Sequence, residues 1–243
     1  MSVRKAVFAL AMLAGLVGAS QAQAAIVTFY GADNGAGPAD ARPFSDAAAS
    51  AFDAAIGAHG LIDFEGLPVG NFGSLGVGPG VTATLTNLDP SYSRISNVDQ
   101  HTPTPLGYNT TAGGNQFLQI SPFFDDAAGG SVTFSFASPI DAFGAYLTDS
   151  QVDFPGGITV TFSDGTSQVL SVAKNSDDGG VLFFGFTDFG ASISSITYNT
   201  GATADTRDLW GIDDVRYATT VPEPGTLALL GAGAGFLLRR RRR

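Results

Sequence analysis

The stretch SVTFSF, residues 131–136, alternates between hydroxyl-bearing and apolar side chains. In an extended strand Val132, Phe134 and Phe136 point to one side, while the serines and the threonine between them point to the other. One face is then buried and the other meets water, which is typical of an antiparallel sheet with one solvated side. The sequence therefore predicts a half-exposed antiparallel strand here.

A hairpin is predicted further along the chain. The runs ITVTF (158–162) and SQVLSV (167–172) flank the turn sequence SDGT (163–166). Asp-Gly at the centre of such a turn favours the positive backbone angles of type I′. We expect two antiparallel strands joined by this tight turn.

Short strand-like runs fill most of the chain between residues 25 and 220, and one helix is expected near 45–58, with Ser45 as its N-cap and Gly57 or Gly60 at its end. The remaining runs are IVTFY (26–30), LIDF (61–64), VTATLT (81–86), QFLQI (116–120), FGAYLT (143–148), VLFFGF (181–186), SITYN (195–199) and GIDDVRY (211–217). Strands without alternating helices predict an all-β domain built as a two-sheet sandwich or a barrel. We see no fixed-period repeat, which disfavours a solenoid or propeller.

The first 24 residues have the order of a secretory signal peptide. Arg4 and Lys5 precede an apolar run over 6–17, and Ala22-Gln23-Ala24 forms a small-x-small cleavage site. The alternative, a transmembrane helix, needs about 20 apolar residues, and this run is shorter. We therefore expect the export machinery and signal peptidase as partners, and a mature chain that begins near Ala25.

The composition of residues 25–220 narrows the choice of ligand. This part holds five basic and 21 acidic residues, a formal charge of −16. Such a surface repels phosphate backbones, so nucleic-acid binding is not expected, and it attracts cations such as calcium. The chain has no cysteine, so core packing and metal ions, rather than disulfides, are expected to hold the fold.

The C-terminal segment combines a proline motif, an apolar stretch and a basic end. Residues 225–238 would form a helix of about 21 Å, short against a hydrocarbon core of about 30 Å. The positive end favours a cytoplasmic position, so this helix is a weak anchor with the domain outside. The motif residues are Val221, Pro222, Glu223 and Pro224, and the basic cluster is Arg239, Arg240, Arg241, Arg242 and Arg243.

This tripartite pattern over residues 221–243 resembles the PEP-CTERM sorting signal. The resemblance implies that an exosortase recognises Pro222-Glu223-Pro224 and cleaves nearby, which makes the inner-membrane anchor temporary. It further implies delivery to the surface or extracellular matrix of a Gram-negative bacterium that makes exopolysaccharide. This segment determines where the protein is delivered and says nothing about the activity of residues 25–220.

Two acidic stretches stand out in the predicted domain: Glu65 follows an early strand, and Asp213 and Asp214 lie in the last one. Successive strand residues face opposite ways, so one of the two aspartates should point inward, where an unpaired carboxylate is unfavourable. The pattern resembles jelly-roll carbohydrate-binding modules, and the resemblance implies a structural Ca²⁺ on Glu65 and Asp213 or Asp214. The alternative is that these carboxylates are solvated or paired with Arg207 or Arg216.

Candidate sugar-stacking rings are Tyr92, Tyr108 and Trp210, the first two in the long segment 87–115 and the third just before a strand, where a core position is the alternative. The sequence contains no HExxH zinc motif, no GxSxG nucleophile elbow and no phosphate-binding loop, so we assign no catalytic residue. We also see no regular Thr-x-Thr array and expect no ice-binding role.

The leading hypothesis is a non-catalytic exported surface or matrix protein with a jelly-roll-like sandwich that binds extracellular polysaccharide. Two alternatives stay open. One is a secreted hydrolase on a jelly-roll scaffold that works through paired carboxylates. The other is a permanently anchored envelope protein with a structural role.

Overall fold

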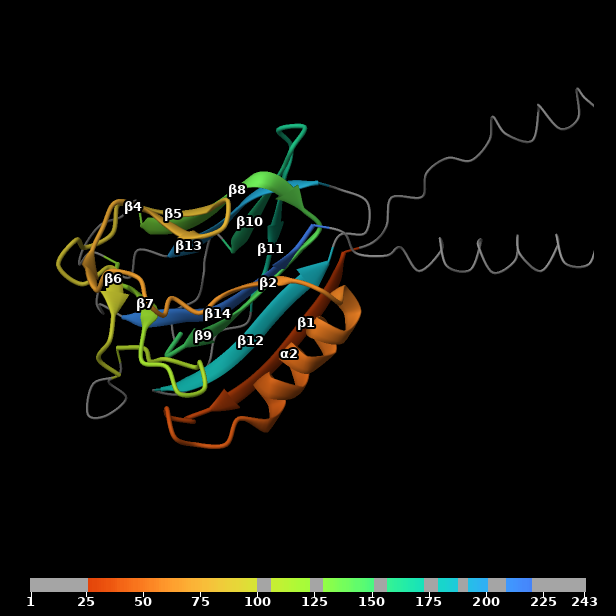
Figure 1. The fold of residues 1–243 in the computed structure, drawn as a ribbon. Coiled ribbons are helices and arrows are strands. Elements are labelled where there is room, and N and C mark those ends of the chain that lie inside the picture. Colours follow the sequence, from red (N-terminus) through yellow and green to blue (C-terminus); the bar gives the residue numbers. More distant parts are fainter. Residues whose placement is uncertain are drawn as a thin grey trace, which may run out of the picture.

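The computed structural model describes residues 26–99, 106–122, 129–150, 157–172, 179–187, 192–200 and 209–219. Within these ranges two antiparallel sheets stack face to face, and one helix lies against the outside (Figure 1). The predicted leader (1–24) and C-terminal segment (221–243) lie outside the described residues. No helix in the described ranges is long and apolar enough to cross a membrane.

The larger sheet has eight strands, and the smaller one has six. The order in the eight-stranded sheet is β1 (Val27–Asn34), β12 (Gly180–Thr187), β9 (Ala142–Thr148), β14 (Trp210–Ala218), β7 (Phe117–Ile120), β6 (Arg94–Ser96) and β3 (Gly70–Asn71), with β2 (Gly60–Ile62) also paired to β14. The order in the six-stranded sheet is β11 (Ser167–Leu170), β10 (Ile158–Phe162), β13 (Ile193–Thr200), β8 (Gly130–Ile140), β5 (Val81–Thr86) and β4 (Ser74–Gly78). This arrangement confirms the all-β, two-sheet antiparallel sandwich.

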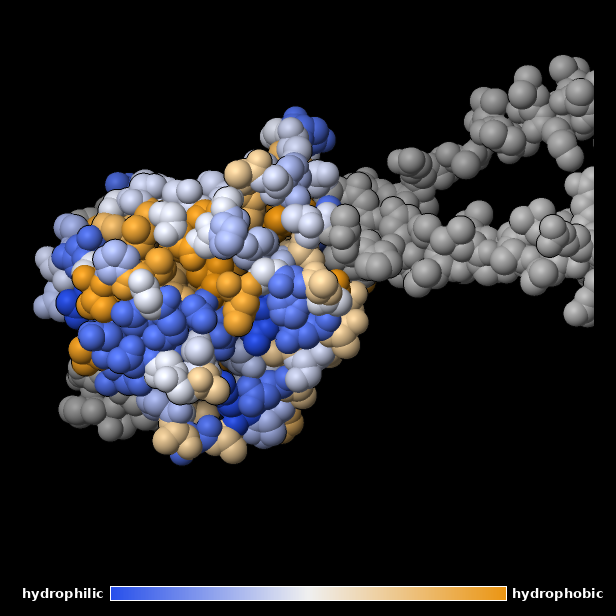
Figure 2. All heavy atoms as spheres, viewed as in Figure 1, coloured by the Kyte–Doolittle hydropathy of each residue, from blue (hydrophilic) through white to orange (hydrophobic). Residues whose placement is uncertain are grey.

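The inner faces of the two sheets form one apolar core. Phe134 of β8 packs against Phe143 of β9 across the sandwich, with ring centroids 5.7 Å apart, and Tyr198 of β13 meets Trp210 of β14 at 6.2 Å. Val132 and Phe134 are fully buried, as their alternation predicts. In the view of Figure 2, apolar surface forms a band between the two layers, bordered by more hydrophilic residues.

Helix α2 (Pro43–Ile56) covers the outer face of the eight-stranded sheet. It runs beside β1 and β12 (Figure 1), and its side chains form a second apolar cluster with that sheet. The ring of Phe52 lies over Gly144 and Gly185. A Cβ atom added to Gly144 would lie 3.0 Å from this ring, and one added to Gly185 would lie 2.8 Å from it. The missing side chains therefore let the helix approach the sheet closely.

The predicted N-cap of this helix is wrong. The helix begins at Pro43, two residues before Ser45, and the N-cap residue Arg42 makes no side-chain cap. Asp33 of β1 takes that role: its Oδ1 accepts from the backbone N–H of Phe44 (3.1 Å), and its Oδ2 accepts from that of Ser45 (2.8 Å). A carboxylate here satisfies free N–H groups and suits the positive end of the helix dipole. The end at Gly57 is confirmed.

The hairpin of β10 and β11 is present, but its turn is not type I′. Only Gly165 has a positive φ (85°), whereas type I′ needs two such residues. Asp164 Oδ1 accepts from both the backbone N–H (2.9 Å) and the hydroxyl (2.7 Å) of Thr166, and this local turn holds the loop in another form. The short strands β3, β4 and β6 were not predicted, because their glycine-rich or brief sequences lack the alternating pattern.

Replacing Phe52 by Ala is expected to lower the free energy of unfolding by about 3–5 kcal/mol, since a fully buried ring between helix and sheet is lost. Urea unfolding followed by the fluorescence of Trp210, the only tryptophan, would measure this. The matched control is Phe44→Ala in the same helix, where the ring is 68% exposed and a small change is expected. Equal losses in both variants would contradict the assigned packing of the helix.

Candidate functional site

The predicted acidic residues Asp213 and Asp214 lie beneath a segment that we call the strap, residues 106–116. Asp213 Oδ2 accepts hydrogen bonds from the backbone N–H groups of Thr110 (2.6 Å) and Thr111 (3.1 Å). The hydroxyl of Thr110 donates to Asp213 Oδ2 (3.1 Å) and Asp214 Oδ2 (3.0 Å). The hydroxyl of Thr111 donates to Asp214 Oδ1 at 2.8 Å. Both carboxylates therefore bind the same two threonines.

A β-bulge in β14 explains how neighbouring aspartates reach the same side. In the pairing of β14 with β9, Asp213 lies opposite Tyr146, and Arg216 lies opposite Gly144. The two residues 214 and 215 of β14 therefore face the single residue 145 of β9, which makes a β-bulge. Asp214 takes a positive φ of 46°, a conformation that Asp tolerates better than most side chains. The expected burial is confirmed for Asp213, which is fully buried, but the bulge breaks the expected alternation, so that Asp214 is buried on the same side.

Glu65 holds the other end of the strap. Its Oε1 accepts from the backbone N–H groups of Asn115 and Gln116, each at 2.7 Å, and Asp99 Oδ1 accepts from that of Asn109 at 2.8 Å. Carboxylates therefore hold the strap at several points along its length. Among the described residues, no three or more His, Cys, Asp or Glu side chains are grouped so that they could hold a metal. The structure thus brings Asp213 and Asp214 together and leaves Glu65 apart.

Burial shifts the protonation of Asp213. Its side chain is 0% exposed, and its Oδ1 has no hydrogen-bond partner among the described residues. Desolvation, and then the nearby charge of Asp214, raise the pKa of Asp213 to about 8, although hydrogen bonds from Thr110 act in the opposite direction. A bound proton is thus one way to remove the buried charge.

A calcium ion is the other way, and it stays a prediction. Ca²⁺ takes six to eight oxygen ligands, and Asp213 Oδ1 is a buried oxygen free to be one of them. The remaining carboxylate oxygens of Asp213 and Asp214 already accept hydrogen bonds from the strap, and Glu65 binds the strap at Asn115 and Gln116 without being grouped with them. The alternative partner Arg216 bonds instead to Asp53 (3.0 Å) and to the backbone oxygen of Asp214 (2.7 Å).

Two of the three predicted sugar-stacking rings are buried. Trp210 is 0% exposed in the core between the sheets, and Tyr108, a residue of the strap, is 1% exposed in the apolar cluster under helix α2, so neither can present a ring face to a ligand. The alternative, a core position, is confirmed for Trp210. The prediction is wrong for Tyr108, whose ring is turned inward. Tyr92, in the connection from β5 to β6, is 40% exposed and remains a candidate.

The outer face of the six-stranded sheet carries an array that sequence reasoning missed. Cross-strand pairing aligns the outward side chains in two rows, and each row crosses all six strands. We call the surface formed by these two rows the hydroxyl face. From β4 to β11 the first row is Ser74, Thr84, Thr133, Thr197, Thr159 and Val169, and the second is Gly76, Thr82, Ser135, Ser195, Thr161 and Ser167. Among these six strands a Thr-x-Thr pair occurs only in β5 and β10, and mixed serine and threonine hydroxyls make up most of the rest of the array. Alternation in VTATLT and ITVTF was a usable signal for it.

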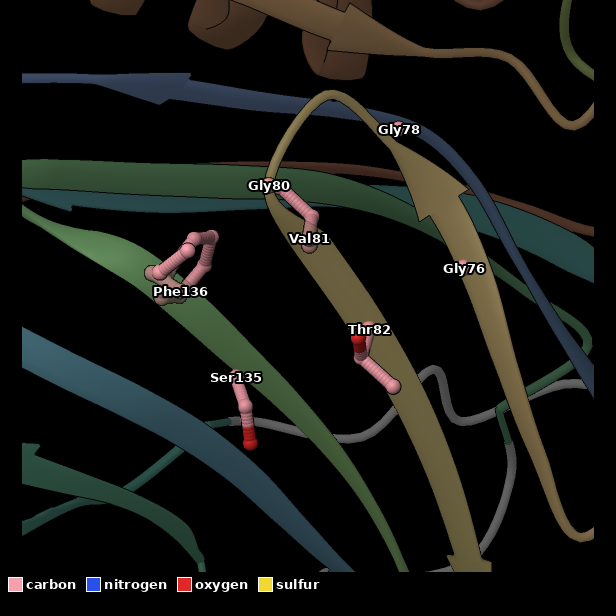
Figure 3. Close-up of a pocket in the computed structure, with 8 residues that line it drawn as sticks. Gly76, Gly78, Gly80, Val81, Thr82, Ser135 and Phe136 are labelled. Carbon is pink, nitrogen blue, oxygen red and sulfur yellow. The ribbon is translucent and has the colours of Figure 1, made fainter.

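A groove interrupts the hydroxyl face near the β4–β5 turn. It has a volume of about 450 Å³ and is lined by residues of β4, β5 and β8 and the turn between the first two. Figure 3 shows Gly76, Gly78 and Gly80 along this hairpin, with Thr82 and Ser135 on the neighbouring strands β5 and β8. Because these glycines carry no side chain, backbone is accessible beside hydroxyl groups.

The C-terminal residues identify the class of protein. Residues 220–243 match the PEP-CTERM protein-sorting motif, as expected from Pro222-Glu223-Pro224 and the arginine cluster. The chain is therefore an exported protein that depends on exosortase for its delivery to the surface. The matched residues lie outside the described part of the structure.

Similarities to solved structures are weak. The chain is 13% identical to a family 29 carbohydrate-binding module from Piromyces equi, over 67% of this chain and 91% of the module, with a TM-score of 0.40. It is 11% identical to the family 11 carbohydrate-binding module of a cellulosomal cellulase of Clostridium thermocellum, over 69% of this chain and 98% of the module, with a TM-score of 0.31. It is 14% identical to a β-1,2-glucanase from Parabacteroides distasonis, over 66% of this chain and 25% of the enzyme, with a TM-score of 0.34. No curated protein matches the chain.

The protonation of Asp213 predicts that stability falls as pH rises. The folded state keeps a proton up to about pH 8, while the unfolded carboxyl releases it near its ordinary pKa of 3.8. Between these values the group lowers the free energy of unfolding by up to about 1.4 kcal/mol per pH unit. Asp213→Asn should abolish this component, because an amide stays neutral. Urea unfolding of both proteins at pH 5 to pH 8 measures the difference.

Bound calcium would give the opposite result. An ion on Asp213 keeps the carboxylate charged, so a chelator would lower the melting temperature of the wild type at neutral pH. An ion at 100 times its dissociation constant adds about 2.7 kcal/mol. Chelator sensitivity that disappears in Asp213→Asn would establish the calcium site and contradict the protonated pair.

Proposed function

We propose that this protein is a non-catalytic component of the cell surface or extracellular matrix of a Gram-negative bacterium, and that its β-sandwich binds extracellular polysaccharide. One observation carries the proposal: an exported domain leaves the outer face of its six-stranded sheet open and lines it with hydroxyl groups in register. Hydroxyl groups donate and accept hydrogen bonds as sugar hydroxyls do. Tyr92 is a further exposed ring that could pack on a sugar.

The rival hypothesis is a hydrolase that works through paired carboxylates. Such enzymes hold two carboxyl groups at the sides of an open, water-accessible bond-cleavage site. In this structure the adjacent pair Asp213 and Asp214 is instead covered by the strap and hydrogen-bonded to Thr110 and Thr111. That arrangement supports a structural role for this pair and favours binding over hydrolysis.

The mature domain, residues 25–220, is expected to co-sediment with insoluble polysaccharide isolated from the producing cells and to leave the polysaccharide intact. Binding is measured as depletion of protein from the supernatant, and hydrolysis as new reducing ends. A heat-denatured sample of the same domain serves as the control for non-specific adsorption. Release of reducing ends would support the hydrolase, and absence of binding to every polysaccharide would contradict the proposal.

The proposal also includes a temporary anchor. The apolar residues 225–238 are too short to be a firm membrane span, and the motif Pro222-Glu223-Pro224 precedes them. The mature protein recovered from the cell surface should therefore lack the arginine cluster 239–243, as measured by intact-mass spectrometry. Glu223→Ala, which leaves the apolar stretch unchanged, should retain the full C-terminus. An intact arginine end in the wild type would favour a permanently anchored envelope protein.

A further inference from the structure

The six-stranded sheet is free of formal charge in a strongly acidic domain. None of its strands β4, β5, β8, β10, β11 and β13 contains Asp, Glu, Lys or Arg, although residues 25–220 carry a formal charge of −16. In the eight-stranded sheet, by contrast, charged residues occur in β1, β6 and β14. The charged residues therefore lie in other parts of the domain. A ligand on the hydroxyl face contacts no charged side chain from these six strands.

The hydroxyl groups of this face are ordered and still have hydrogen-bonding capacity. Cross-strand pairs join Ser74 Oγ to Thr84 Oγ1 (3.2 Å) and Thr133 Oγ1 to Thr197 Oγ1 (2.9 Å). Each hydroxyl can donate one hydrogen bond and accept two, so one such contact leaves acceptor positions for a ligand. Neighbouring strands lie about 4.8 Å apart, and alternate residues along a strand lie about 6.7 Å apart. The face thus presents a grid of groups at fixed spacing.

The glycine groove gives this grid a recess. The groove has a volume of about 450 Å³ and is shallow and open to solvent. Gly76 and Thr82 are consecutive members of the second row, so the groove opens directly into the hydroxyl face. Thr82 and Ser135 supply hydroxyl groups at its side (Figure 3). A ring that projects from a longer chain can enter here while the chain follows the rows.

We propose that the hydroxyl face and its glycine groove bind an uncharged polysaccharide and discriminate against acidic ones; this inference rests on the proposed function and names its ligand class and site. Hydroxyl groups satisfy the hydroxyls of a neutral chain. A uronate or sulfate would find no cation on the six strands, and removing such a charge from water without a partner is unfavourable. The negative charge of the whole domain also repels an acidic chain at a distance.

Ice is the other ligand that a regular hydroxyl array suggests, and the geometry favours a polysaccharide. Ice presents a rigid lattice, whereas sheets of this kind twist from strand to strand. The register also shifts beyond Gly76 and beyond Ser195, so the regular spacing does not extend past the second row. A polysaccharide chain can follow a twisted surface because its linkages rotate.

The test combines three substitutions on the face with a matched control. Thr84→Val, Thr133→Val and Thr197→Val together remove three aligned hydroxyls while keeping β-branched side chains that suit a strand. The control is Thr28→Val, an exposed threonine of β1 in the other sheet. Affinity electrophoresis in gels that contain an uncharged glucan, an uncharged mannan or alginate measures binding. Melting temperatures of all variants confirm that they are folded.

The wild type and Thr28→Val should be retarded by an uncharged polysaccharide and not by alginate, and the triple variant should lose at least tenfold in affinity. Ser135→Lys, which adds a cation to the face, should gain retardation by alginate. Equal retardation of wild type and triple variant would overturn the assigned face and leave the proposed function standing. Stronger binding to alginate would overturn the ligand class alone. In the remaining outcome the protein binds none of the three gel polysaccharides and none of the polysaccharide isolated from the producing cells, and shapes ice crystals instead. That result would overturn both the proposed function and the ligand class.

Discussion

A two-sheet sandwich has four sheet faces, and its core can bury only two of them. With no cysteine in the chain, burial of the inner faces is what holds the two sheets together, and the fate of the outer faces differs. Helix α2 and the strap cover the outer face of the eight-stranded sheet and add a second apolar cluster. Outward residues of the six-stranded sheet stay in contact with water. This asymmetry decides which surface is available to a ligand.

Two arginines of the domain, Arg42 and Arg216, lie at the covered face. Arg42 and Arg216 both lie over the ring of Tyr146, at 4.9 and 5.3 Å from its centroid, and the Tyr146 hydroxyl donates to Asp46 at 2.7 Å. Arg42 also donates to the backbone oxygen of Thr110 in the strap. These charged groups connect helix, sheet and strap, so their main role is to fix the cover. The open sheet needs no such connections, and its strands contain no charged residues.

The sequence pattern predicts what depends on local alternation, and it fails where tertiary contacts decide. Strands β5 and β10 match their predicted ranges, and so does the two-sheet class, because each depends on period-two burial. The bulge at Asp214, the capping of helix α2 by Asp33 and the burial of Tyr108 each depend on segments far apart in the sequence. The hydroxyl face needs the cross-strand register, which the strands taken one by one do not give. The sorting motif is the opposite case, since it is read as a linear pattern and needs no fold.

Separation of charge within the domain is compatible with both solubility during export and the proposed binding of a neutral chain. A large net charge keeps a protein soluble and prevents self-association during export, but charge at a binding surface requires a ligand of opposite sign. Placing the negative charge outside the six-stranded sheet keeps the first advantage while leaving a face that a neutral chain can approach. If charge were distributed evenly, each acidic group on that face would lose hydration when a neutral sugar covered it, and the loss would oppose binding. Under the proposed function, the absence of charge from these strands matches a neutral chain as the group that they contact.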